Sequence, residues 1–364
     1  MEEEGIFEQL FRLLQSPGPV NWKLAREVTR GLAGDKEPIE PAIAEEYREL
    51  ATAASLRLDE LPELPPPAAN ELHPTDRATW AAENQQTFRV LVEPLADKLS
   101  PGSMSAAGEM GAMLQPLGPA LLGVQAGTMV GFMSHRVLGQ FDTGIPTMDH
   151  DRPYIVVPNV EAFREDHGLD SREIRLWAAL HEMAFHRLMA VEWLRGHFVS
   201  IIKEFYDTVE FDIPGLMGKL SSLEDPAQLE ELIGDQPSAT PALLRGESDP
   251  ERLRVVQAFT AFVEGYGDYV VRRAAADLIT DLDRIEEAYS RRRAEPDQAE
   301  QYLQQLAGLA LERHRARDAT VFCGDVVERW GQDALHQVWD DPQNLPTFAE
   351  LTDPVGWAAR VLLD

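Results

Sequence analysis

The 364-residue sequence contains a single cysteine, Cys323, which excludes an intramolecular disulfide bond. Cys323 lies in the apolar run TVFCGDVVERW, a pattern that favours a small core residue of a helix over a nucleophile. The chain also lacks the cysteines of a zinc ribbon, a phosphate-binding loop and an internal repeat. These absences exclude disulfide scaffolds, zinc ribbons and repeat architectures.

Basic residues are scarce: 33 Lys and Arg stand against 62 Asp and Glu, which gives a net charge of −29. A charge of this sign repels phosphate backbones and anionic lipid headgroups, so it argues against nucleic acid or an anionic membrane surface as a partner. The first residues, MEEEGIFEQLFRLL, are acidic where a secretory signal peptide would be basic. We therefore expect a cytoplasmic protein.

Long hydrophobic runs are also missing. The one segment that raises the question of a membrane span, residues 117–133, has 17 residues, which is slightly short for a spanning helix. Gly123, Gly127 and Gly131 follow one another in it at a spacing of four, which permits close contact with another helix. We expect no membrane insertion and a buried central helix, against which the two helices described below would pack.

The periodicity of the remaining sequence predicts a mainly α protein with a small β-sheet. Helices are expected at residues 20–33, 43–56, 80–99, 277–293 and 298–315. Strands are expected at 154–157 and 208–211, and an extended proline-rich loop at 61–74. Pro158 and Asn159 would end the first strand, with Asn159 facing a substrate cleft.

Domain organisation follows from length and composition. The sequence is 44% hydrophobic, which supports a sizeable core, and no clear linker divides it. We expect one domain over residues 1–364, which can also be described as an N-terminal helical lobe (1–100) packed on a core (101–364).

The hexapeptide HEMAFH at residues 181–186 nearly spells HExxH, the helix motif in which two histidines four residues apart bind one zinc ion. That spacing leaves the two side chains roughly 40° apart on one helix face, whereas five residues separate His181 and His186 by roughly 140°. Phe185, which has no lone pair, stands at the position of the second ligand. A one-residue π-bulge would bring His186 back into line with His181.

The segment around this motif is also typical of a packing helix. Apolar or aromatic side chains recur at spacings of three and four, at Ile174, Trp177, His181, Phe185 and Leu188. A histidine followed by a glutamate in such a stripe is often structural, so both interpretations stay open.

A second helix, VVQAFTAFVEGYGDYVV from residue 255, carries a narrow polar stripe that includes Glu264 and Asp268. Two buried carboxylates one turn apart need hydrogen bonds, ion pairs or a cation, because burial of an unpaired charge is costly. Glu264 is therefore either the third ligand of a zinc ion or the partner of a basic residue such as Arg136, Arg187 or Arg272.

Segments along nearly the whole chain resemble one family. They are VNWKLAREVTRGLA, DRATWAAENQQTFRVLVEPL, GVQAGTMVGFMSHRVLGQFD, YIVVPNV, LHEMAFHRLMAVEWLRGHF, FVEGYGDYV and GQDALHQVWDDPQNLPTFAELTDPVGWAARVL. In this order they are similar to a zincin-like family of uncharacterised proteins classed as candidate hydrolases, some linked to biosynthesis of a deazaflavin coenzyme. The resemblance implies a zincin-like fold of the metalloprotease type.

The resemblance also implies roles for single residues. The family's motif helix is similar to HExAHH, so His181 matches the first metal ligand, Glu182 the general base and His186 the extra histidine. Glu264 corresponds to the downstream glutamate ligand, in a segment similar to EGHADHV, and Tyr266 replaces a histidine there. The implied metal ligands are thus His181, His186 and Glu264.

In the intact site, zinc held by two histidines and a glutamate lowers the pKa of its bound water towards about 7, and the motif glutamate takes up the proton. Glu182 would be this base. Tyr266 would be a second catalytic residue that donates to a developing oxyanion, unless it is a packing residue. Asp268, one turn beyond Glu264, would orient a histidine through its other ring nitrogen.

Two functions follow from these residues. The first is a zinc-dependent hydrolase with an altered HExxxH site, acting on a peptide or amide bond of a peptide or small-molecule substrate. The second is a catalytically degenerate zincin that serves as a binding or scaffolding protein, because Phe185 removes a ligand. A role connected with the deazaflavin coenzyme rests on the resemblance alone.

Overall fold

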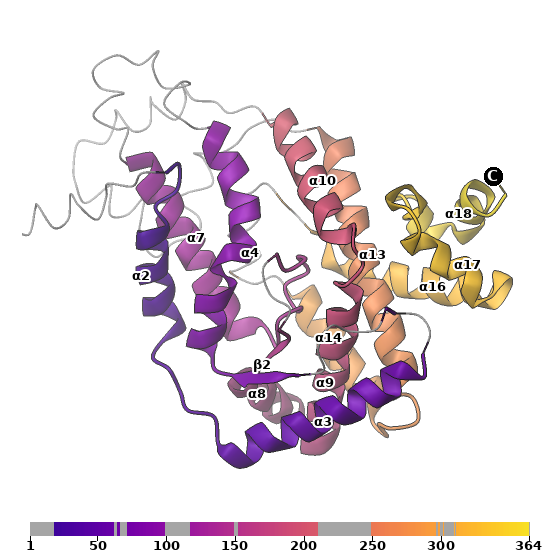
Figure 1. Cartoon of the computed structure of the whole chain (residues 1–364), viewed down its shortest axis with the longest axis horizontal. Coiled ribbons are helices and arrows are strands. Elements are labelled where there is room, and N and C mark those ends of the chain that lie inside the picture. Colours follow the sequence, from indigo (N-terminus) through magenta and orange to yellow (C-terminus); the bar gives the residue numbers. More distant parts are fainter. Residues whose placement is uncertain are drawn as a thin grey trace, which may run out of the picture.

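Long helices make up most of the described residues, and two short strands lie among them (Figure 1). The structure is a computed structural model that describes residues 18–61, 64–65, 71–98, 117–148, 152–209, 249–295, 298, 301, 309 and 311–363. This architecture confirms the expected class, mainly α with a small sheet. Whether residues 1–364 form one domain or two lobes stays a prediction.

Three helices from the first part of the chain lie side by side: α2 (Trp22–Ala33), α4 (Arg77–Lys98) and α7 (Leu117–Arg136) (Figure 1). Helices α2 and α7 approach closely because α7 carries glycines on the shared face. A Cβ on Gly127 would lie 2.4 Å from the main-chain oxygen of Ala25. Over the described residues, no helix is long and apolar enough to cross a membrane.

The sheet consists of two parallel strands, β1 (His73–Thr75) and β2 (Tyr154–Val156). Strand β2 confirms the expected strand, whereas β1 begins inside the segment that was expected to be a loop. The chain turns directly into α8 (Val157–His167) after β2. Asn159 lies in this helix and is buried, with its amide donating to the carbonyls of Ser134 and Val137. The prediction that Asn159 faces a cleft was wrong.

The two motif-bearing helices pack against each other. Helix α9 (Ser171–Leu188) lies between α3 (Pro41–Asp59) and α13 (Pro250–Ala275), and α10 (Leu194–Thr208) covers another part of α13. Helix α7 packs mainly on α2 and α4, so the expectation that it supports both motif helices was wrong. The face of α7 that carries the glycines packs against α2 instead.

The C-terminal part continues from α13 into α14 (Leu282–Ala294), a 3₁₀ turn η2 (Arg313–Arg315) and α16 (Ala316–Trp330). Helix α16 packs on α13 and buries Cys323, which confirms its expected core position. Shorter elements complete the chain: α17 (Gln332–His336), η3 (Gln337–Trp339), η4 (Pro342–Asn344), η5 (Glu350–Thr352) and α18 (Pro354–Val361).

Two expected elements differ from the structure or lie partly outside it. Thr208 ends a helix rather than starting a strand, because α10 continues to it, and residues 210–211 lie outside the described residues. Of the helix expected at 298–315, the last three residues form the 3₁₀ turn η2, and most of the others lie outside the described residues.

Candidate functional site

Helix α9 is regular through the HEMAFH segment. Asp170 caps its N-terminus by accepting from the main-chain N–H groups of Arg172 and Glu173. The helix is α throughout, so the π-bulge that would align His186 with His181 does not form. As the spacing predicts, His181 and Phe185 share a face: their rings are stacked, with centroids 4.5 Å apart. The ring of His186 lies beside Phe141, with centroids 6.4 Å apart, and Phe141 also stacks on Phe185, at 6.5 Å.

Phe185 fills the space between α9 and α13. Its side chain is buried, and its ring lies against the backbone of Gly267, where an added Cβ would come within 2.2 Å of the ring. A residue larger than glycine at 267 would therefore collide with this ring. The side chain that replaces the second ligand is thus tightly packed.

Glu182 faces the backbone of the loop at residues 137–148. One carboxylate oxygen, Oε2, accepts from the main-chain N–H groups of Gln140, at 2.8 Å, and Phe141, at 3.2 Å. The side chain is 2% exposed. Burial raises the pKa of Glu182, and the hydrogen bond with His181 opposes this rise. The base of the expected mechanism is therefore enclosed by main chain.

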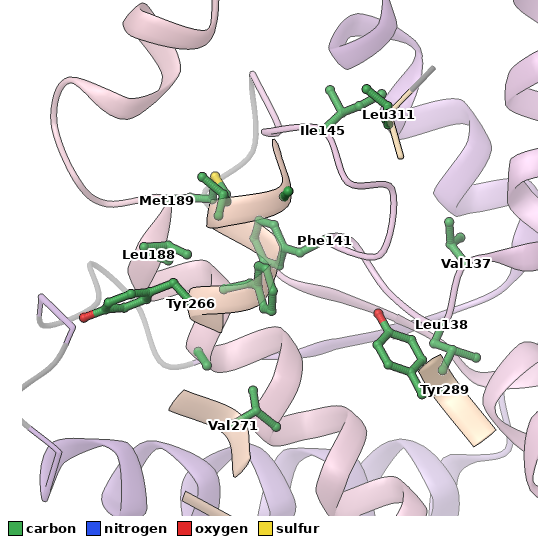
Figure 2. Packing of buried hydrophobic residues seen from close by; sticks show 14 of the residues in the cluster. Val137, Leu138, Phe141, Ile145, Leu188, Met189, Tyr266, Val271, Tyr289 and Leu311 are labelled. Carbon is green, nitrogen blue, oxygen red and sulfur yellow. The ribbon is translucent and has the colours of Figure 1, made fainter. Parts of the chain in front are cut away.

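His181 links Glu182 to a residue that the sequence did not indicate. Its Nδ1 lies 3.2 Å from Oε1 of Glu182, and its Nε2 lies 3.2 Å from the hydroxyl of Tyr289 in α14. Both ring nitrogens therefore have protein partners. Figure 2 shows Tyr289 with its hydroxyl directed to the interior, and burial raises its pKa well above the ordinary value.

The Tyr289 hydroxyl in turn donates to Oδ1 of Asp142 at 2.6 Å. The other oxygen of Asp142 accepts from the main-chain N–H of Leu138 at 2.9 Å. Burial opposes ionisation of Asp142, but Arg313 and the Tyr289 hydrogen bond prevail and lower its pKa. A continuous chain of buried hydrogen bonds thus runs from Glu182 to an ionised Asp142.

Glu264 is buried on α13 and is held by Arg313. Its Oε1 accepts from Nε of Arg313 at 3.0 Å and from Nη2 at 2.8 Å. Asp268, one turn further, pairs with Arg293 of α14. The ion-pair alternative had suggested three other arginines. Two of these bind elsewhere: Arg187 contacts Asp59, and Arg272 pairs with acidic residues of α14.

Tyr266 lies on a different side of α13 from Glu264. Its ring packs edge-on against Trp339, with centroids 4.8 Å apart, and burial raises its pKa. In Figure 2 its hydroxyl points away from Phe141. The structure therefore brings His181, Glu182 and Phe185 together, while Tyr266 belongs to the packing between α13 and η3.

Sequence reasoning missed Asp142, Tyr289 and Arg313. For Asp142 the sequence held one signal: the segment GVQAGTMVGFMSHRVLGQFD, which resembles the family, ends at this residue. Tyr289 and Arg313 lie more than a hundred residues beyond His181, and no local spacing connects them with the motif. Their roles depend on how α14 and η2 pack against α13 and the loop.

A family model described as zincin-like metallopeptidase matches residues 20–358. The chain belongs to this family. A crystal structure from Chloroflexus aurantiacus, described as a candidate hydrolase with a novel fold, is similar at a TM-score of 0.67 and 23% identity. The match covers 95% of this chain and 99% of the other, so the two proteins share their fold over nearly their whole length. No curated protein matches the chain.

Zincin-like metallopeptidases use zinc, but the residues here do not fit this ion. A catalytic zinc takes three protein ligands and keeps one open position. In the part of the chain that the structure describes, no group of three or more His, Cys, Asp and Glu side chains is placed to hold a metal ion. The cavity between Phe185 and Glu264 has a volume of about 10 Å³, which leaves no room for a substrate.

Proposed function

We propose that this chain is a catalytically degenerate zincin-like protein that works as a binding or scaffolding protein without zinc. The observation that carries the proposal is the ring of Phe185, stacked on His181 and packed on Gly267. It takes the position of a ligand and provides no electron pair for a metal ion. Family membership gives the fold, whereas function depends on the residues of the site.

Three polar side chains near Phe185 support this proposal because each has a protein partner. His181 uses both ring nitrogens, Glu182 accepts from two main-chain N–H groups, and Glu264 accepts twice from Arg313. A zinc ion would have to break several of these contacts in a buried place. Such a network is costly to disturb because each released polar group would lose its partner.

A surface groove supports a binding role. It has a volume of about 580 Å³ and lies between α4 and α10. Apolar side chains and charges of both signs line it: Gln86, Arg89, Val90, Glu93, Pro94, Asp97, Met148, Val199, Lys203, Tyr206 and Asp207. The buried hydroxyl of Tyr206, beneath this groove, has no hydrogen-bond partner among the described residues.

The alternative function is a zinc-dependent hydrolase. Two observations favour it: His181 and Glu182 match the first two residues of the zinc motif, and the chain belongs to a metallopeptidase family. It requires the chain to rearrange so that His186 and Glu264 reach one metal ion with His181. The two functions differ in a property that is directly measurable, the zinc content.

The experiment is elemental analysis of the chain purified without chelator and without a histidine tag. We expect far less than one zinc per chain, because His181 is the one motif histidine on the required face and Arg313 holds Glu264. The matched variant is Phe185→His combined with Arg313→Gln, which restores a second histidine and releases Glu264. We expect this double variant to take up about one zinc per chain.

About one firmly bound zinc in the unaltered chain would contradict the proposal and favour the hydrolase. In that case peptide hydrolysis that is lost in Glu182→Gln would identify the base. A double variant that folds, as judged by circular dichroism, but takes up no zinc would show that the ligand geometry itself has been lost.

A further inference from the structure

The carboxylate of Glu264 lies in a pocket of oxygen atoms that encloses one cationic group, the guanidinium of Arg313. Both side chains are nearly inaccessible, at 5% and 9% exposure. Besides its two contacts with Glu264, the guanidinium donates from Nη2 to the main-chain oxygen of Asp142 at 3.1 Å. The same Nη2 lies 3.6 Å from Oδ1 of Asp142. Two acidic side chains and a carbonyl thus surround one cation.

The loop at residues 137–148 is shaped around this ion pair. Gly144 has a φ of +70°, a conformation that residues with a side chain rarely adopt. A Cβ at this position would lie 2.8 Å from Oε1 of Glu264 and 3.4 Å from Nε of Arg313. The backbone approaches the ion pair so closely that a side chain does not fit.

The segment that delivers Arg313 is strained. Glu312, directly before it, has a φ of +49°, and it is the one non-glycine residue with positive φ in the described part of the chain. A left-handed conformation is unfavourable for such a residue and persists where surrounding contacts determine it. The turn η2 begins at the next residue and packs against α13, α14 and α16. The strain therefore lies at the point where the arginine enters the core.

The geometry suits a guanidinium better than a metal ion. A guanidinium is planar and has five N–H donors, so it bridges a carboxylate and a carbonyl that lie on different sides of it. Zinc sites use thiolate, imidazole or carboxylate ligands in a tetrahedral arrangement, whereas here one of the groups around the cation is a main-chain carbonyl oxygen, that of Asp142. Two carboxylates buried without any cation would be strongly destabilising.

We propose that the pocket formed by Glu264, Asp142 and the loop at Gly144 is a guanidinium-binding site, filled by the chain's own Arg313 in place of a metal ion. Arg313 thereby fastens η2 and the start of α16 to the core. This inference rests on the proposed zinc-free state, because a zinc ion on Glu264 would displace the arginine.

The test is chemical rescue of Arg313→Ala in the full chain. We expect the thermal unfolding midpoint to fall by roughly 5–10 °C, because the buried carboxylates of Glu264 and Asp142 lose the guanidinium that lies between them. Guanidinium chloride at about 20 mM, far below denaturing concentrations, should restore at least half of the loss. Sodium chloride at the same concentration should not. The control is Arg315→Ala, in the same turn, whose acidic partners Asp318 and Glu312 are each at least one-third exposed; it should change the midpoint little and show no rescue.

An unchanged midpoint in Arg313→Ala, or rescue by sodium chloride equal to that by guanidinium, would overturn the inference. If Arg313→Ala does not fold, the pair Glu264→Gln and Arg313→Gln answers the same question. The double variant should be more stable than Arg313→Gln alone, since it no longer buries the Glu264 carboxylate without a counter-ion. A double variant that is less stable than Arg313→Gln would overturn the inference too. The zinc content of the unaltered chain reports separately on the proposed function.

Discussion

At the scale of single residues, Phe185 and Glu182 show how a family site changes its character. Helical spacing placed Phe185 beside His181, and the structure has their rings stacked. The residue identity then determines the chemistry, because a phenyl ring has no lone pair. Glu182 keeps its place in the motif, but it is buried against main-chain N–H groups. A residue that matches a catalytic motif is therefore compatible with a structural role.

The raised pKa of Glu182 leads to a prediction about pH. The unfolded chain ionises this carboxyl near its ordinary pKa, whereas burial delays ionisation in the folded chain. As pH rises from the ordinary value through the raised one, the unfolded state loses its proton first, so the folded state loses stability. The contribution is fully present at low pH and lost at high pH.

Glu182→Gln removes this titration, because the amide resembles the protonated carboxyl and its oxygen still accepts from the same N–H groups. We expect the variant to gain stability relative to the unaltered chain as pH rises from about 4.5 to 8. Urea unfolding at several pH values measures the difference. The exposed Glu328→Gln variant controls for the loss of one negative charge. A stability difference for Glu182→Gln that shrinks as pH rises would contradict the sign of the shift.

At the scale of elements, the helix period identified α9 and α13 and the expected core helix α7. It did not identify the partner of α7. The spacing of Gly123, Gly127 and Gly131 predicted close contact with a helix, and the structure shows that helix to be α2. Strand β1 was missed because it has three residues, one of them proline, and exists through pairing with β2. Short elements of this kind are stabilised by distant partners and leave little local pattern.

The contact between α2 and α7 gives a prediction for Gly127→Val. An added Cβ would lie 2.4 Å from the carbonyl oxygen of Ala25, and backbone cannot move aside as a flexible side chain can. We expect the free energy of unfolding to fall by about 2–3 kcal/mol, as for other overpacked contacts. The control is Gly324→Ala in α16, where an added Cβ meets nothing within 4 Å.

Gly324→Ala should leave the free energy of unfolding unchanged or raise it by up to about 1 kcal/mol, because alanine favours a helix. Urea denaturation measures both variants. A Gly127→Val variant within about 0.5 kcal/mol of the unaltered chain would show that the two helices are less closely packed than the structure indicates.

At the scale of the whole molecule, the enclosed motif site and the surface groove between α4 and α10 differ in their access. The site at Phe185 has a cavity of about 10 Å³, and the groove has about 580 Å³. Of these two sites, only the groove is large enough for a ligand of peptide size. The net charge of −29 favours neutral or basic ligands over acidic ones, because long-range repulsion slows the approach of an anion.

We therefore expect neutral or basic tetrapeptides to raise the thermal unfolding midpoint more than acidic ones of equal length. The variant Val199→Trp should abolish the shift, since Val199 is a partly exposed residue of the groove wall. The control is Leu278→Trp, at an exposed apolar position that does not line the groove. Shifts that survive Val199→Trp would place peptide binding elsewhere on the molecule.

The sequence by itself determined the mainly helical class, the family, the positions of most helices and the fact that Phe185 replaces a ligand. The helices follow from the spacing of apolar residues, the family from the similarity of sequence segments, and the lost ligand from the identity of one residue. The tertiary structure decided that Arg313 pairs with Glu264 and that Tyr289 joins His181 to Asp142. Such partners come from elements far apart in the chain, and only the packing of α9, α13, α14, η2 and the loop at residues 137–148 brings them within hydrogen-bond distance.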